Sequence, residues 1–448
     1  MDDTAPKGAV GATKPQQAGH PEAPAAEPKA YRNLTLKEAA HKTPRPTITD
    51  TEAPIDLVKM RAYRLGRLRE QLKKQDIAAC VLLSPYSIRY ATGVRNCAIF
   101  QTHIPAGYLF VPAEGPTVYF DSEPGLFTAR DLETVDETRT DVLPLSYMFA
   151  SGRLGEWTGT WAGQMTDLLD AHGGGNRRFA IEWASARALA AFADLGVEAL
   201  DAADVIEPAR VLKSPEEILC MNAAIAAAED GMWRMRNALR PGMTEVELWS
   251  HLWCANIEAG GDWIECRLLA SGDRTNPWQQ EASSRKIRPN ELVCFDTDMV
   301  GPFGYCADIS RAFFSGPGKP SDAQRELYSR AFEEVHHNLG LMKPGASFRE
   351  LTEMSFRQPE RFREQHYPVL AHGVGMSDEW PAIYYPQDAA FIYDGALAPG
   401  MTMSVESYVG EVGGREGVKL EQQILITEDG HELLVQFPFE EELLGSTG

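Results

Sequence analysis

The stretch "FDTDMVGPFGYCADIS", Phe295 to Ser310, places three aspartates inside segments that otherwise read as two short strands. Strand interiors select against aspartate, so these carboxylates call for a physical reason. Side chains alternate along a strand, and Asp296 and Asp298 are therefore expected to point to the same face. The turn "VGPFG" permits an antiparallel return strand that brings Asp308 beside them. The pattern indicates a positive charge held between the three aspartates.

Three more candidate residues lie later in the chain. Glu406 in "MSVESY" and Glu421 in "VKLEQQI" each interrupt an apolar strand, and His372 lies in "LAHGVGM" beside glycines that allow close backbone approach. Five carboxylates and one imidazole, if convergent, need a counter-charge in a low-dielectric site. An oxygen-rich set with one histidine and no cysteine suits Mn, Fe, Co or Zn in a bridged dinuclear centre. The alternative is that each acid is an ordinary residue on the surface of a strand. This explanation is reasonable for any one of the residues but poor for all six together.

The length of 448 residues predicts two domains plus a tail. Residues 1–50 are rich in Ala, Pro and Gly and are expected to form an extended or disordered N-terminal arm. An alternating α/β pattern occupies residues 51–210. A second domain, residues 211–448, is expected to open with a helix for which Ser214 is the N-cap and Glu217 completes a capping box.

The net charge of −21 argues against a nucleic-acid or anionic-membrane partner. The chain has no apolar run approaching the length of about 20 residues that is needed to span a bilayer. Its first residues lack the apolar segment of a signal peptide. Seven cysteines without a CxxC motif favour buried, reduced thiols. These features together predict a cytoplasmic protein.

The ordered pattern of the six candidate ligands, with "HGVGM", "SVES" and "KLEQQILIT", resembles the metallopeptidase/creatinase family of "pita-bread" enzymes. Methionine aminopeptidase, aminopeptidase P, prolidase and creatinase are its members. The resemblance implies an α/β (α+β) fold, with a creatinase-like N-terminal α/β domain followed by a pita-bread catalytic domain. The family habit also implies a homodimer. By the same resemblance the metal ligands are Asp296, Asp298, Asp308, His372, Glu406 and Glu421.

Departures from the peptidase pattern bear on the expected activity. The family's first ligand lies in a D-x-G pattern, whereas this chain reads Asp296-Thr297-Asp298. The peptidases carry a His–Glu pair after "HGVGM", where this chain has Asp378 and Glu379. The combination resembles the dimethylsulfoniopropionate lyases built on the prolidase fold, also in "VRNCAIFQTHIPAGYLF" and "QHYPVLAHGVGMSDEWPAI".

That resemblance implies cleavage of a zwitterionic substrate, dimethylsulfoniopropionate, to dimethyl sulfide and acrylate. It implies two transition-metal ions, of which iron is expected and Mn, Co, Zn or Ni are alternatives. Asp378 would be the general base that abstracts the α-proton. Because a free aspartate has a pKa of about 3.9, we expect an apolar setting formed by Met376, Trp380 and Pro381 to raise it. The alternative is that Asp378 or Glu379 forms a salt bridge in a loop.

The sulfonium end of such a substrate would need aromatic faces, which attract cations. Tyr367, just ahead of His372, is the first candidate, and Trp183 and Trp278 are weaker ones. For each of these aromatic residues, packing in the core is the alternative.

Two other classes of function remain open from the sequence. One is a dinuclear-metal hydrolase of the Xaa-Pro aminopeptidase, prolidase or creatinase kind. The peptidases carry one histidine in the His–Glu pair and another upstream of the first metal strand, and the absence of both here, the second around Trp278 and Gln279, counts against a hydrolase. The other is a peptide-binding domain that has lost its metals, which six retained candidate ligands argue against.

Overall fold

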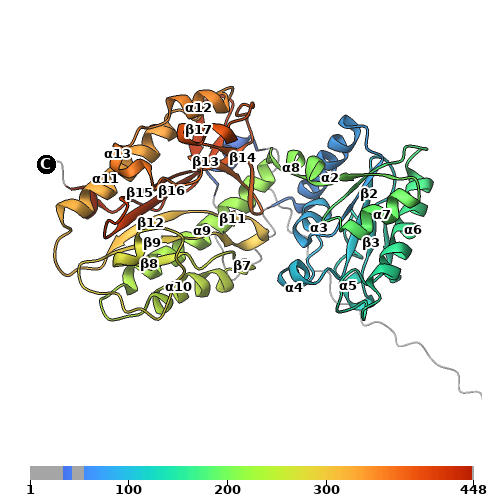
Figure 1. Cartoon of the computed structure of the whole chain (residues 1–448), viewed down its shortest axis with the longest axis horizontal. Helices are drawn as coiled ribbons and strands as arrows, with labels where there is room; N and C mark the ends of the chain where they lie inside the picture. Colours follow the sequence, from blue (N-terminus) through green and yellow to red (C-terminus); the bar gives the residue numbers. More distant parts are fainter. Residues whose placement is uncertain (1–33, 43–54, 446–448) are drawn as a thin grey trace, which may run out of the picture.

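The computed structural model describes residues 34–42 and 55–445. Its helices and strands form two mixed α/β halves that lie side by side, the first drawn in blue to green and the second in green to red (Figure 1). The first half has one sheet and the second has three smaller ones. The predicted α/β (α+β) class is therefore confirmed.

The first half is built on a six-stranded sheet in the order β4-β3-β2-β1-β5-β6. Its neighbours β1 and β2 are antiparallel, whereas β1, β5 and β6 run parallel. Such parallel strands need helical crossovers, which cover both faces of the sheet. The strands are β1 Ala79–Leu82, β2 Tyr108–Pro112, β3 Val118–Phe120, β4 Glu137–Arg139, β5 Arg178–Ile181 and β6 Glu198–Asp201.

Helices enclose this sheet because its central strands are apolar on both sides. The strand β1, Ala79–Leu82, is buried throughout, as the run "AACVLLS" predicts. The long helix expected over "MRAYRLGRLREQLKK" is also present and buries one apolar face. The helices are α2 Leu57–Lys74, α3 Pro85–Thr92, α4 Ala98–His103, α5 Glu123–Leu126, α6 Leu154–His172, α7 Ala186–Asp194 and α8 Ala203–Arg210.

The predicted N-terminal arm is described only at residues 34–42, and the rest of it lies outside the described residues. There the chain forms a short helix, α1 Leu36–Ala40, with a capping box between Thr35 and Glu38. The side-chain amide of Asn222 donates to the carbonyls of Ala39 and Ala40, which ties this helix to α9. The expectation of an extended arm is wrong for this stretch, because the capping box and the buried alanines stabilise a helix.

The second half opens with α9, Pro215–Ala238, and α10, Glu245–Glu258. The predicted N-cap is confirmed: the Ser214 side chain accepts from the Glu217 amide, and the Glu217 carboxylate accepts from the Ser214 amide. Because α8 ends at Arg210 and α9 begins at Pro215, we keep a domain boundary near residue 210 as our proposal.

Two antiparallel sheets of the second half, β12-β9-β8 and β14-β13-β15-β16-β17, position the candidate ligands, and β12 lies against β16. The third sheet is β11-β10-β7. The strands are β7 Trp263–Ile264, β8 Leu269–Ser271, β9 Leu292–Asp296, β10 Met299–Val300, β11 Cys306–Ala307, β12 Ser310–Phe314, β13 Ala371–Val374, β14 Asp378–Ile383, β15 Thr402–Gly410, β16 Gly417–Ile426 and β17 His431–Leu433.

Further helices cover these sheets, with α11 along β15 and β16 (Figure 1). They are α11 Asp322–Leu339, α12 Phe348–Met354, α13 Glu360–Arg363 and α14 Glu441–Leu444, with 3₁₀ turns η1 Gly272–Thr275, η2 Pro302–Gly304 and η3 Pro386–Phe391. Among the described residues no helix is long and apolar enough to cross a membrane. All seven cysteines are free, and Cys97, Cys254 and Cys266 are exposed, so the expectation of buried thiols is wrong for these three.

Candidate metal centre

The three aspartates of the opening stretch lie at breaks between strands rather than within one strand. Asp296 is the last residue of β9, and Asp298 lies between β9 and β10 with a φ of 37°. Asp308 lies at the matching break between β11 and β12. The Thr297 hydroxyl donates to the Ala307 carbonyl and accepts from the Ile309 amide, which joins the two breaks. The expectation of two aspartates on one regular strand is therefore wrong, although the side chains still converge.

The breaks suit the residues found there. Aspartate is one of the few residues other than glycine that visits the left-handed region, so Asp298 adopts it at low cost. Asp296, Asp298 and Asp308 each place a carboxylate oxygen within 4.8 Å of the others. Asp296 and Asp308 are almost fully buried, whereas Asp298 retains partial exposure.

His372 on β13 joins the cluster through its Nε2 atom. The pairing of β13 with β14 shifts register between His372 and Gly373, where the Nδ1 atom lies 2.9 Å from the Gly373 carbonyl. A carbonyl can only accept, so Nδ1 carries a proton, and Nε2 is the ring nitrogen that faces the carboxylates. Nε2 lies 3.2 Å from Asp308 Oδ2. With the Nδ1 proton held by a carbonyl, Nε2 is the atom that would bind a metal ion after losing its own proton.

The two glutamates face each other across neighbouring strands. Glu406 on β15 pairs in register with Glu421 on β16. Their Oε1 atoms lie 3.4 Å and 3.6 Å, respectively, from His372 Nε2. All six residues singled out in the sequence therefore converge in one cluster.

The cluster leaves several oxygen atoms without a hydrogen bond. Asp296 Oδ1, Glu406 Oε1 and Glu421 Oε1 are buried and have no hydrogen-bond partner among the described residues. Buried carboxylate oxygens without a partner are costly, and a bound cation would satisfy them. The set of five carboxylates and one imidazole thus fits a metal centre with oxygen-rich ligands.

Lys419 is a member of this cluster that the sequence analysis missed. Its Nζ atom lies 2.8 Å from Glu406 Oε2, 3.0 Å from Glu421 Oε2 and 3.2 Å from Asp296 Oδ2. The lysine is fully buried on β16. The signal was available, because Lys419 precedes Glu421 by two positions on an apolar strand and therefore shares its face.

The crowding of carboxylates changes their pKa values in the metal-free protein. Burial raises the pKa of Asp296 to about 6 and that of Glu406 to about 8. Burial also raises the pKa of Glu421, but attraction to Lys419 and His372 outweighs it and the net pKa is lowered. Burial lowers the pKa of His372, yet the nearby carboxylates of Asp308, Glu421 and Glu406 leave it well above its usual value.

Asp378, the predicted base, lies at the rim of the cluster at the start of β14. Its Oδ1 atom is 3.8 Å from His372 Nδ1, and its side chain is 67% exposed. The apolar setting expected around it is absent, because Trp380 is itself 40% exposed. Alternation along β14 sends the side chain of Asp378 away from the buried side that receives Glu379.

Glu379 has a different environment from Asp378. Its carboxylate is buried between Arg210, at 2.8 Å, and Lys213, at 2.7 Å. Burial raises the pKa of Glu379, but these two cations lower it below the usual value. The salt-bridge alternative thus holds for Glu379, which links the last residue of α8, Arg210, and the following Lys213 to β14.

Of the three aromatic residues predicted to bind a sulfonium group, one lies at the cluster and two do not. Tyr367 lies at the cluster, since Lys419 Nζ is 4.4 Å from the centre of its ring. Trp278 is buried and stacks on Tyr408, which favours the core-packing alternative. Trp183 is 52% exposed in the first half of the chain and has no aromatic or cationic partner among the described residues.

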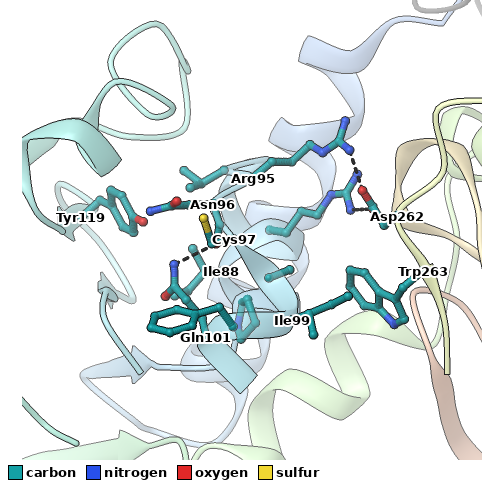
Figure 2. A pocket seen from close by; sticks show the side chains of 14 residues that line it. Ile88, Arg95, Asn96, Cys97, Ile99, Gln101, Tyr119, Asp262 and Trp263 are labelled. Carbon is teal, nitrogen blue, oxygen red and sulfur yellow. Dashed lines mark hydrogen bonds and ion pairs between the residues drawn. The ribbon is translucent and has the colours of Figure 1, made fainter. Parts of the chain in front are cut away.

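Arg89 and Arg95 from the first half both pair with Asp262 of the second half (Figure 2). They line a cavity of about 420 Å³ together with Trp263 and the residues of α4. The cavity contains none of the six convergent residues. It lies at the contact between the two halves, apart from the candidate metal centre.

Comparison with known proteins shows the family. The model of "Metallopeptidase family M24" matches residues 219–428, and that of "Creatinase/Prolidase N-terminal domain" matches residues 64–212. Dimethylsulfoniopropionate lyase DddP of Roseovarius nubinhibens is 38% identical over 396 residues, covering 87% of this chain and 89% of that protein. The protein of the same name from Roseobacter denitrificans is 37% identical and covers 87% and 88%.

Solved structures show the same fold at lower identity. An Xaa-Pro dipeptidase from Bacillus anthracis superposes with a TM-score of 0.68 at 21% identity, covering 85% of this chain and 99% of that one. An X-Pro aminopeptidase from Thermotoga maritima gives a TM-score of 0.67 at 22% identity, covering 84% and 98%.

The chain belongs to metallopeptidase family M24, whose enzymes use a dinuclear metal centre. Within that family its branch is that of the DddP lyases rather than the peptidases, as 37–38% identity over most of the chain shows. The expected order, a creatinase-like domain followed by a pita-bread domain, is confirmed.

Proposed function

We propose that this chain is a metal-dependent carbon–sulfur lyase that cleaves dimethylsulfoniopropionate to dimethyl sulfide and acrylate. The observation that carries the proposal is the placement of Asp378, an exposed carboxylate at the rim of a six-residue cluster with unpartnered oxygens. The names of the two lyases at 37–38% identity point to the same reaction.

The six convergent residues would hold two metal ions: Asp296, Asp298, Asp308, His372, Glu406 and Glu421. The ions, when bound, would stabilise the negative charge that develops at the substrate carboxylate during removal of the α-proton. Iron is our proposal for both positions, with Mn, Co, Zn or Ni as alternatives, because the ligand set accepts each of them.

Asp378 would take the α-proton of the substrate. The electron pair of that C–H bond forms the carbon–carbon double bond of acrylate, and the carbon–sulfur bond breaks with its electrons on sulfur. Dimethyl sulfide leaves as a neutral molecule, so the reaction needs no general acid. The exposure of Asp378 leaves its oxygens accessible to substrate, whereas Glu379 is committed to two cations. A single base at the rim therefore suffices.

Tyr367 would face the sulfonium group of the substrate. Its ring lies 4.4 Å from one cation, the Lys419 ammonium group, and this contact supports a role of the ring in binding a second cation. Trp183 and Trp278 remain weaker proposals, because Trp183 lies in the first half and Trp278 is buried against Tyr408.

The proposal is tested by incubating purified, metal-loaded protein with dimethylsulfoniopropionate and measuring dimethyl sulfide in the headspace, with and without a chelator. We expect dimethyl sulfide and acrylate in equal amounts, and loss of both when the metal is removed. Xaa-Pro dipeptides are assayed in parallel. Hydrolysis of the dipeptides without release of dimethyl sulfide would reject the lyase and establish the hydrolase alternative.

We also propose that the enzyme acts in the cytoplasm as a homodimer. Free cysteines without disulfides support a reducing compartment. Exposed apolar side chains in the first half, Phe100, Phe127, Tyr147, Met148 and Phe149, support a protein contact there. Light scattering coupled to size-exclusion chromatography should give the mass of a dimer, and the mass of one chain would exclude it.

A further inference from the structure

Lys419 contacts only one of the two oxygens of each of three candidate ligand carboxylates. Its Nζ atom contacts the Oε2 atoms of Glu406 and Glu421 and the Oδ2 atom of Asp296. The Ser310 hydroxyl donates to the same Glu421 Oε2 at 2.8 Å. One oxygen of each carboxylate is therefore occupied by a donor from the protein.

The other oxygen of each carboxylate remains free. Asp296 Oδ1, Glu406 Oε1 and Glu421 Oε1 are buried and have no hydrogen bond to any residue that the structure describes. The two glutamate Oε1 atoms also face His372 Nε2. Lys419 thus divides three carboxylates into an outer oxygen that it binds and an inner oxygen left for metal ions, so its contacts do not compete with metal binding.

Lys419 is held in this place by more than the carboxylates. Its Nζ atom donates to the Ser310 hydroxyl at 2.9 Å and lies 4.4 Å from the centre of the Tyr367 ring. The side chain is fully buried. The ammonium group therefore has no route to solvent without a rearrangement of its neighbours, and its charge stays fixed beside the centre.

We propose that Lys419 biases this centre toward divalent metal ions by fixing one positive charge against three of its carboxylates. The inference rests on the proposed dinuclear centre. Five carboxylates and one ammonium group carry a net formal charge of four negative units, which two divalent cations match. In a buried site each extra positive charge is repelled by the ammonium group, so a trivalent ion loses more affinity than a divalent one.

The test is the midpoint potential of iron in the loaded protein, because that potential measures the relative affinity for Fe²⁺ and Fe³⁺. Lys419→Gln and Lys419→Met remove the charge. We expect each to favour Fe³⁺ at least tenfold, which lowers the midpoint potential by about 59 mV for a one-electron couple. Lys419→Arg keeps the charge, and its midpoint potential should be close to that of the parent protein.

Ser310→Ala is the matched control, since it removes a hydrogen bond from Lys419 and from Glu421 without changing any charge. Its midpoint potential should move far less than that of the neutral variants. Metal content and the far-ultraviolet circular dichroism spectrum are measured for every variant, so that potentials are compared only between folded proteins with two ions.

An unchanged or raised potential in the folded, loaded neutral variants would overturn the inference and leave the lyase proposal intact. Loss of both ions from folded neutral variants would also overturn it, because a residue that opposes metal charge is not needed to retain metal. A parent protein that binds no metal would instead reject the proposed centre, and the inference with it.

Discussion

At the scale of single residues, Asp378 and Glu379 show how adjacent carboxylates take different roles. Alternation on β14 exposes Asp378 at the rim of the cluster and buries Glu379 between Arg210 and Lys213. Asp378 is exposed and has no salt bridge to a Lys or Arg in the described part of the chain, so its carboxylate is available to accept a proton from a substrate.

Replacement of Asp378 by Asn should remove the base and retain the shape of the side chain. We expect turnover of dimethylsulfoniopropionate to fall by at least about 100-fold, the usual contribution of a positioned base. Metal content, measured by plasma mass spectrometry, should be unchanged because Asp378 lies outside the convergent set. Asp394→Asn, at an exposed carboxylate paired with Arg349, is the control and should keep full activity. Loss of metal in Asp378→Asn would reassign the residue to metal binding.

Tyr367 should contribute to substrate binding through the face of its ring. Tyr367→Ala is expected to raise KM for dimethylsulfoniopropionate about tenfold, since a desolvated cation–π contact is worth about 1–2 kcal/mol. Tyr367→Phe keeps the ring and should leave KM nearly unchanged. Steady-state kinetics on both variants check this. A lower kcat with unchanged KM in Tyr367→Ala would indicate that the ring acts by supporting Lys419 instead.

The residues of the cluster could be predicted from the sequence, but their local geometry could not. Six polar residues in apolar strands stood out because burial of such groups needs compensation. The left-handed Asp298 and the strand breaks were invisible, because period-two alternation assumes an unbroken strand. Lys419 was missed because a lysine in a strand is commonly a surface residue. Its spacing of two from Glu421 could have placed it on the same face, but its contacts with three carboxylates are visible only in the tertiary structure.

At the scale of elements, the end of α8 and the segment that follows it are joined to β14 by a buried charge network. The Glu379 carboxylate lies within 2.8 Å of Arg210 and 2.7 Å of Lys213, and all three side chains are at most 7% exposed. A buried pair is strongly destabilising when one partner is removed, because the other charge stays buried.

Replacement of Glu379 by Gln should therefore lower the free energy of unfolding by about 3–5 kcal/mol. Urea denaturation followed by fluorescence measures the change. Glu156→Gln is the matched control, because it breaks an exposed pair between Glu156 of α6 and Arg153, the residue before this helix. This substitution should leave the midpoint of the urea transition unchanged. Equal effects of the two substitutions would show that the buried network does not stabilise the junction.

The helices and strands that could be predicted from the sequence are those whose boundaries are marked by neighbouring residues in the chain. The Ser214–Glu217 capping box fixed the start of α9, and the apolar run fixed β1. The helix α1 was missed because the composition of residues 1–50 hid its Thr35–Glu38 capping box. The contacts that hold this helix, from Asn222, come from a residue far away in the sequence.

At the scale of the whole molecule, the two halves meet at a charged contact that lies apart from the candidate metal centre. Arg89 and Arg95 of the first half meet Asp262 of the second, while the six convergent residues come from strands and strand breaks of the second half alone. The centre is therefore assembled by the second half, and metal binding should stabilise that half directly.

Metal binding should also change how the stability of the whole molecule depends on pH. Burial raises the pKa of Asp296 to about 6 and that of Glu406 to about 8 in the metal-free protein. Between an unfolded pKa of about 4 and these folded values, the folded state binds more protons than the unfolded state. The stability of the metal-free protein therefore falls as pH rises through this window.

Bound metal ions replace the protons on these carboxylates, so the metal-loaded protein should not lose stability as pH rises. We expect the difference in Tm between metal-loaded and chelator-treated protein to widen from pH 5 to pH 8, as measured by differential scanning fluorimetry. The Glu406→Gln variant, which lacks the group with the higher pKa, should show a smaller widening. A difference in Tm that stays constant over this range would mean that the carboxylates are not proton-bound without metal, and that the orphaned oxygens of the cluster are satisfied in another way.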